Sequence, residues 1–122
     1  MDESFPKSRR LLKRSEFDRT FDQGVVLKND QVVIYCAEGT TEQTRLGIVI
    51  GSHVKKAVQR NRLKRVIRAG FRRAYSGLPK GYDLVVIPRN TSGLSSADVR
   101  KSLRSLVTED RIAQKQSETA SE

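Results

Sequence analysis

The chain has 122 residues, with 24 lysines and arginines against 14 aspartates and glutamates, which gives a formal net charge of +10 at pH 7. This length predicts a single domain with one modest hydrophobic core, and neither a membrane-spanning run nor a signal-peptide pattern is visible, so we expect a soluble cytoplasmic protein. One histidine, one cysteine and scattered carboxylates argue against a protein metal centre and acid-base catalysis, whereas the positive charge predicts an anionic partner.

The N-terminal segment, 1–12, is basic and has no helical or strand periodicity, so we expect a flexible or extended arm. A short helix is predicted over 15–23, with Ser15 as its N-cap and Gly24 as its C-cap. Phe17 and Phe21 lie on one face of this helix. They either pack on a sheet or offer a stacking platform for unpaired bases.

Two β-rich runs, 25–28 and 31–37, flank the turn pair Asn29-Asp30 and predict a hairpin. In the second run, Val32, Ile34 and Cys36 alternate with Val33, Tyr35 and Ala37. Because both sides are largely apolar and only one can face helices, the other is expected to expose a partly aromatic surface that suits base stacking. The lone cysteine is expected to be a small buried hydrophobe.

A third strand is predicted over 45–50, and the most basic part of the chain follows it, residues 55–73, with nine lysines or arginines and no acidic residue. Helical spacing gives an apolar face of Leu63, Val66, Ile67, Gly70 and Ala74, bordered by Phe71, and a polar face of Asn61, Lys64, Arg65, Arg68 and Arg72. Like charges at this spacing destabilise a helix by about 0.2 to 0.5 kcal/mol per pair. A bound nucleic acid would relieve this repulsion, so we expect one here rather than a solvated surface helix.

Turn-forming residues at 76–81 precede a predicted strand, 82–87, and a last helix that begins at Ser95 or Ser96 and ends near 107. The buried face of this helix is expected to contain Val99, Leu103, Leu106 and Val107. Because a strand, a long helix and a strand follow one another, strands 45–50 and 82–87 are predicted to be parallel in one sheet. The segment 108–122 lacks periodicity and is expected to be a polar tail.

The string Arg60-Asn61-Arg62 in the basic helix resembles the RNR motif of the bacterial ribonuclease P protein component. The resemblance covers 5–107 in order and includes the pair Phe17 and Phe21, the strand with Tyr35 and a later strand that reads YDLVVIPR. It implies an α+β fold, an α/β sandwich in which a mixed four-stranded sheet packs with about three helices. The β-α-β crossover of that family is left-handed, although the general rule is right-handed.

The resemblance also implies the site residues within one RNA-binding domain, 13–107. Contacts with the catalytic RNA subunit are expected at Lys56, Arg60, Asn61, Arg62, Lys64, Arg65, Arg68 and Arg72. The 5′ leader of precursor tRNA is expected in a cleft between the first helix and the open sheet face, at Lys13, Arg14, Phe17, Phe21 and Tyr35. On the helical wheel Arg60 lies at the apolar border and Arg62 on the opposite flank. Two roles are therefore open for these arginines: they orient the helix, or they reach other RNA strands.

One junction departs from the family pattern. Where the family commonly has Ser-Lys-Lys and, two residues on, a glycine, this chain has Gly51, Ser52, His53 and Lys55. Lys55 and Lys56 are expected to supply the missing charge.

The implied function is that of the protein subunit of an endonuclease that removes the 5′ leader from precursor tRNA and leaves a 5′ phosphate. In that enzyme the RNA subunit contains the active site and holds most of the Mg²⁺ ions. We therefore expect no catalytic or metal-binding residue in this chain, no membrane or DNA partner, and a monomer when RNA is absent. The alternatives are a generic basic RNA-binding protein, such as a ribosomal protein without a leader cleft, and a protein-only nuclease.

Overall fold

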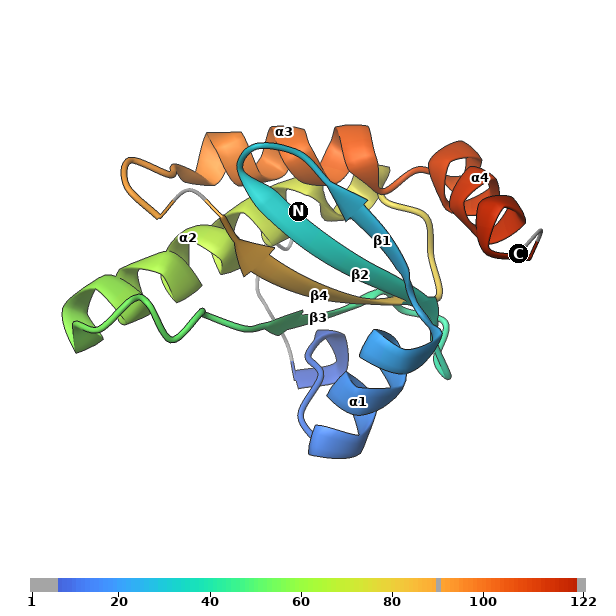
Figure 1. Ribbon diagram of the computed structural model, residues 1–122, viewed down its shortest axis with the longest axis horizontal. Coiled ribbons are helices and arrows are strands. Elements are labelled where there is room, and N and C mark those ends of the chain that lie inside the picture. The colour runs from blue at the N-terminus through green and yellow to red at the C-terminus, as the bar shows by residue number, and fades with distance from the viewer. Residues whose placement is uncertain (1–6, 90, 121–122) are drawn as a thin grey trace.

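The computed structural model describes residues 7–89 and 91–120 (Figure 1). Its elements in chain order are η1 (Lys7–Arg9), α1 (Arg14–Gln23), β1 (Val25–Lys28), β2 (Val32–Glu38), β3 (Arg45–Ile48), α2 (Ala57–Ala74), η2 (Tyr75–Gly77), β4 (Tyr82–Pro88), α3 (Ser96–Leu106) and α4 (Glu109–Ala120). The four strands form one sheet in the order β1-β2-β4-β3. β2 is antiparallel to β1 and β4, whereas β3 and β4 are parallel, so the predicted mixed sheet is confirmed.

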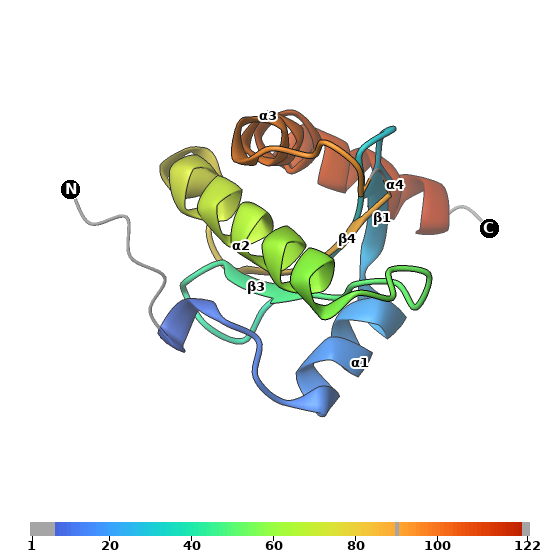
Figure 2. The ribbon, with the colours of Figure 1, turned by 90° about the vertical axis from the view of Figure 1, so that its left-hand side faces the viewer.

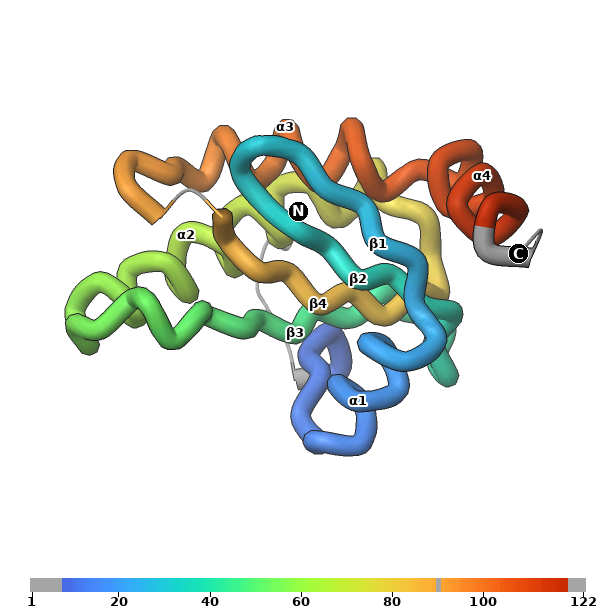
Figure 3. Tube along the Cα trace, in the orientation of Figure 1, coloured from blue at the N-terminus to red at the C-terminus, as the bar shows by residue number. Residues whose placement is uncertain are grey.

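The sheet separates two layers of helices. α2 and α3 lie on one face and α1 lies on the other (Figure 2). α4 stands at the outer edge of β1, as the trace in Figure 3 shows. The α+β class is confirmed, with four α-helices where about three were expected. The left-handed crossover from β3 through α2 to β4 stays a prediction.

The main core lies between the sheet and the layer of α2 and α3. Each of its central side chains is at most 1% exposed: Ile34, Leu63, Ile67, Phe71, Leu84, Val86, Val99 and Leu103. α2 and α3 approach closely at Gly70, where a Cβ atom would lie 2.6 Å from the Cβ of Val99. The apolar faces predicted for both helices are therefore the buried ones, and a glycine is needed where the helices meet.

The predicted hairpin is present, and Asn29 fixes its turn. The Asn29 side-chain oxygen accepts hydrogen bonds from the backbone N–H groups of Gln31 (2.8 Å) and Val32 (3.0 Å). An asparagine side chain that bonds the backbone two residues on is a common way to stabilise a turn. The alternation of β2 is also as predicted, with Ile34 and Cys36 buried in the main core and Tyr35 half-buried on the α1 side.

The start of α1 differs from the prediction. The helix begins at Arg14, with Lys13 in the N-cap position, and Ser15 is not the cap. One carboxylate oxygen of Glu16 instead accepts hydrogen bonds from the backbone N–H groups of Leu12 and Lys13, both at 2.9 Å. The carboxylate thus satisfies the N–H groups of the N-cap residue and of the residue before it, which is the Glu half of a capping box.

Part of the predicted N-terminal arm is attached to the domain, while residues 1–6 lie outside the described part of the chain. The Arg9 guanidinium lies 3.8 Å from the centre of the Tyr75 ring, a cation–π contact. Leu11 is only 5% exposed, and its N–H donates to the carbonyl oxygen of Leu46 (3.0 Å). Residues 10 and 11 therefore extend the sheet beyond its β3 edge.

The expectation of a polar tail after residue 107 is wrong for 109–120, which form α4. Ile112 is 1% exposed and belongs to the main core, and its N–H donates to the Thr108 carbonyl oxygen (2.9 Å). Burying one isoleucine side chain contributes about 1.5 to 3 kcal/mol. A single large apolar residue in a polar stretch anchors this helix, and it gives no periodic pattern that the sequence could reveal.

Candidate RNA interface

The exposed face of α2 presents the cations that the helical wheel assigned to it. Arg65 and Arg68 are exposed, and Lys64 and Arg72 are half-buried. Asn61 is also exposed. None of the salt bridges found among the described residues involves these four cations. The face therefore remains available for phosphate groups, which arginine can hold with two parallel hydrogen bonds.

The two arginines of the Arg60-Asn61-Arg62 string point into the protein. Arg60 Nη1 donates to the carbonyl oxygens of Gly51 and Val54, both at 3.0 Å, and its Nη2 donates to that of Ile50 at 3.3 Å. Arg62 Nη2 donates to the carbonyl oxygen of Leu94 at 2.9 Å. Of the two roles left open by the sequence, this geometry favours orienting the helix. RNA contact by either arginine stays a prediction.

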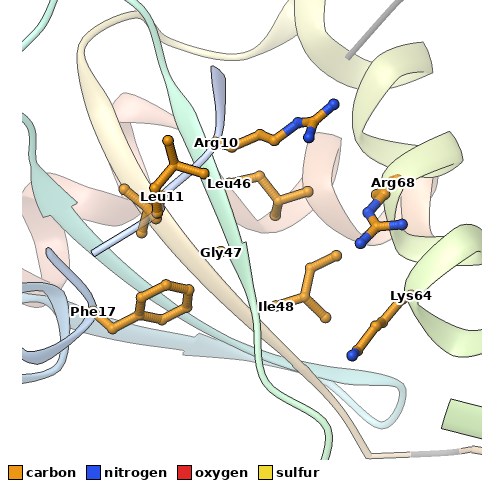
Figure 4. A pocket seen from close by; sticks show the side chains of 9 residues that line it. Arg10, Leu11, Phe17, Leu46, Gly47, Ile48, Lys64 and Arg68 are labelled. Atoms are coloured by element: carbon orange, nitrogen blue, oxygen red, sulfur yellow. The ribbon is translucent and has the colours of Figure 1, made fainter. Parts of the chain in front are cut away.

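A groove, called here the cationic slot, lies between the N-terminal segment, β3 and α2 (Figure 4). It has a volume of about 270 Å³ and is lined by Arg10, Leu11, Leu12, Phe17, Leu46, Gly47, Ile48, Lys64 and Arg68. Three cations lie over an apolar floor, and none of the described residues that line the slot is acidic. The structure thus brings Phe17, assigned to the leader path, next to Lys64 and Arg68, assigned to the RNA subunit.

Phe17 reaches the slot because Gly47 leaves room for its ring. A Cβ atom at residue 47 would lie 2.5 Å from Phe17 Cε1, far inside van der Waals contact. From the sequence, Arg10 was expected in the basic arm but not in a site. Its only signal was the Arg9-Arg10 pair, because the residues of β3 and α2 that line the slot lie more than 30 residues away in the chain.

The second aromatic residue of α1 stands over the open face of the sheet. The rings of Phe21 and Tyr35 have centroids 4.8 Å apart and an interplanar angle of 74°, an edge-to-face pair. Val26 is directly opposite Tyr35 in the β1–β2 register and is 37% exposed. Phe21, Tyr35 and Val26 form an exposed apolar patch, called here the aromatic strip. Phe17 thus packs on the sheet at Gly47, which is the first of the two alternatives left open by the sequence, while Phe21 stays partly exposed. Base stacking on Phe21 stays a prediction.

The remaining predicted leader residues, Lys13 and Arg14, are exposed at the N-terminal end of α1. Arg14 lies 3.9 Å from Asp18, one turn on, and both side chains are largely exposed. An ion pair of this kind contributes little to stability and leaves the arginine able to contact a phosphate.

A buried ion-pair cluster fixes α1 to the sheet. Asp83 is fully buried, and Arg45 donates to it from Nε and from Nη2, both at 2.9 Å. Arg19 of α1 donates to the same carboxylate, and Arg45 Nη1 donates to Glu16 at 2.7 Å. The hydrogen bond from the Lys13 N–H is the main cause that lowers the pKa of Glu16 to about 2. This cluster holds the helix that carries both phenylalanines, and its one sequence signal was an aspartate inside an apolar strand.

The described residues contain no group of three His, Cys, Asp or Glu side chains that could hold a metal ion, and no helix among them is long and apolar enough to cross a membrane. His53 is exposed in the loop before α2. Burial raises the pKa of the Cys36 thiol to about 12, so this side chain is protonated at neutral pH and is a poor nucleophile.

Similarity to known proteins gives the family of this chain. Residues 5–110 match the family described as Ribonuclease P. The chain is 42% identical over 89 residues to the ribonuclease P protein component of Thermotoga petrophila, covering 73% of this chain and 76% of that protein. It is 34% identical over 117 residues to that of Bacillus pumilus, covering 94% and 98%.

Solved structures give the same result. The ribonuclease P protein from Thermotoga maritima matches with a TM-score of 0.71 and 37% identity, covering 80% of this chain and 94% of that one. The Staphylococcus aureus protein matches with a TM-score of 0.72 and 27% identity, covering 87% and 98%. The chain therefore belongs to the ribonuclease P protein family, the protein subunits of a ribonucleoprotein endoribonuclease.

Proposed function

We propose that this chain binds the catalytic RNA subunit of ribonuclease P through the exposed face of α2, and that it binds the 5′ leader of precursor tRNA along α1 and the aromatic strip. The observation that carries the proposal is the arrangement of two kinds of surface around α1. Cations with an apolar floor form the slot, and exposed rings form the strip. Single-stranded nucleic acid needs both, because its phosphates are anionic and its unpaired bases stack on aromatic side chains.

The reaction itself belongs to the RNA subunit in this proposal. A divalent metal ion, which we propose to be Mg²⁺, would polarise the scissile phosphate and activate water. The described side chains do not supply a ligand set for it. The chain contributes binding and orientation of the substrate, in the cytoplasm where precursor tRNA is made. The family match favours this role over that of a generic ribosomal protein.

The experiment is cleavage of a 5′-labelled precursor tRNA by a bacterial catalytic RNA at low Mg²⁺ concentration, with and without this protein. We expect the protein to restore cleavage at the mature 5′ end and to have no activity alone. The matched control is a variant with Arg65 and Arg68 reversed to glutamate, which should fail to restore cleavage while remaining folded. If the wild-type protein does not change the rate of precursor tRNA cleavage, the proposal is contradicted.

A further inference from the structure

Helix α4 lies almost wholly outside the part of the chain that matches the family, which ends at residue 110. It packs on β1, the edge strand on the far side of the sheet from β3 (Figure 1). Together α4 and β1 form a groove of about 240 Å³, called here the α4 groove, lined by Val26, Leu27, Lys28, Leu106, Arg111, Gln114 and Lys115. Three of the residues that line the α4 groove, Arg111, Gln114 and Lys115, therefore lie beyond the family match.

The α4 groove is continuous with the aromatic strip. Phe21 contacts Tyr35, and Tyr35 lies opposite Val26 in the strand register. Val26 then lines the groove, where α4 stands beyond the edge of the sheet. A chain that crosses the strip from Phe21 toward β1 therefore enters the α4 groove next. Because neighbouring strands are about 4.8 Å apart, the groove is within roughly 10 to 15 Å of the ring of Tyr35.

The chemistry of the groove fits single-stranded RNA. Lys28, Arg111 and Lys115 line it, and none of its lining residues is acidic. Lys115 pairs with Glu118 at 3.5 Å, so its charge is partly neutralised. Lys28 and Arg111 are exposed, and neither takes part in a salt bridge among the described residues. Cations beside an apolar wall suit phosphates with unpaired bases, whereas a duplex keeps the faces of its bases stacked inside.

We propose that the α4 groove binds the nucleotides of the 5′ leader that lie farther from the cleavage site than those on the aromatic strip. This inference rests on the proposed function, since it extends the same single-stranded path. It makes a distinct claim, because a leader too short to pass Val26 cannot reach Lys28 or Arg111. The affinity for long leaders should therefore depend on α4, and the affinity for short leaders should not.

The test uses the complex of catalytic RNA and full-length protein, with precursor tRNAs whose leaders have roughly 4 and roughly 12 nucleotides. The variant K28Q/R111Q removes one lysine and one arginine from the groove. The control, R100Q/K101Q, removes the same two residue types from the exposed side of α3. Thermal unfolding of both variants checks that α4 stays folded, which is expected because Ile112 is unchanged.

For K28Q/R111Q we expect weaker binding of the long-leader precursor only. The slope of log K against log salt concentration should become shallower by roughly 1.4, about 0.7 for each single-strand phosphate contact. With the control variant, the difference in affinity between the long-leader and the short-leader precursor should be the same as with the wild type. The inference is overturned if K28Q/R111Q lowers the affinity for both precursors equally, or if it changes neither affinity. If instead the wild-type complex does not distinguish precursor from mature tRNA, the proposed function itself fails.

Discussion

Arg45 holds Asp83 with two parallel hydrogen bonds of 2.9 Å, from Nε to Oδ1 and from Nη2 to Oδ2, across the parallel pair β3 and β4. Arg19 of α1 reaches the same carboxylate. One buried aspartate thus joins the sheet to the helix that carries Phe17 and Phe21. The position of the proposed leader-binding surface therefore depends on an ion-pair cluster that contains none of the residues expected to touch RNA.

Replacing Asp83 by asparagine should therefore both destabilise the fold and weaken leader binding. The change removes the anion that buried Arg45 and half-buried Arg19 share and leaves Arg45 only its pair with Glu16. Breaking a buried ion pair costs about 3 to 5 kcal/mol. Chemical denaturation measures the loss in the free energy of unfolding. Asp22, on the exposed surface of α1, provides the matched control, and its change to asparagine should have almost no effect. Equal stability of the two variants would show that the cluster does not anchor α1.

The same cluster predicts a pH dependence that involves Glu16. Its pKa falls from 4.5 to about 2 on folding, chiefly because the Lys13 N–H donates to it, with a further contribution from Arg45. A depressed pKa means that the ionised form stabilises the folded state above pH 4.5 and that this stabilisation is lost as the pH falls toward 2.

We expect the wild type to be more stable than an E16Q variant at neutral pH, and the difference between them to shrink as the pH falls from about 4.5 to about 2. Urea denaturation of both proteins across this pH range measures the difference in their free energies of unfolding. A difference that stays constant over the range would contradict the assignment, since glutamine cannot titrate.

Arg60 and Arg65 should separate stability from RNA binding, although both belong to the basic helix. Arg60 donates to three backbone carbonyl oxygens in 50–54, so R60A should lower the free energy of unfolding by about 1 to 3 kcal/mol. Arg65 is exposed, and R65E/R68E should abolish assembly with the catalytic RNA without changing thermal unfolding. Circular dichroism and filter binding measure the two properties. An R65E/R68E protein with unchanged RNA affinity would refute the role assigned to the α2 face.

Gly47→Ala should displace the Phe17 ring, because the added Cβ atom would lie 2.5 Å from it. We expect weaker binding of precursor tRNA by the complex with G47A, through the altered shape of the cationic slot. A double-mutant cycle with F17A supplies the control: once the ring is absent, the same glycine change should have little further effect. Additive losses would mean that Gly47 acts through something other than Phe17.

The sequence predicted the features that depend on local periodicity. The apolar stripes of α2 and α3 repeat over several turns, and the alternation of β2 covers its whole length, so both were visible without a structure. α4 was missed because Ile112 is its one large apolar side chain. For Arg60 and Arg62 the sequence left two roles open and could not decide between orienting the helix and reaching RNA. Their acceptors lie in loops up to 32 residues away, and Arg19 reaches Asp83 across 64 residues.

The most direct test of the account is the affinity of the assembled complex for precursor tRNA compared with mature tRNA, for the wild type and for F17A/F21A. Stacking of a base on an aromatic side chain contributes about 1 to 3 kcal/mol. The wild type should bind the precursor more tightly, and F17A/F21A should lose most of that preference while it still assembles with the catalytic RNA. If F17A/F21A keeps the full preference for the precursor, these rings do not bind the leader and the central claim is wrong.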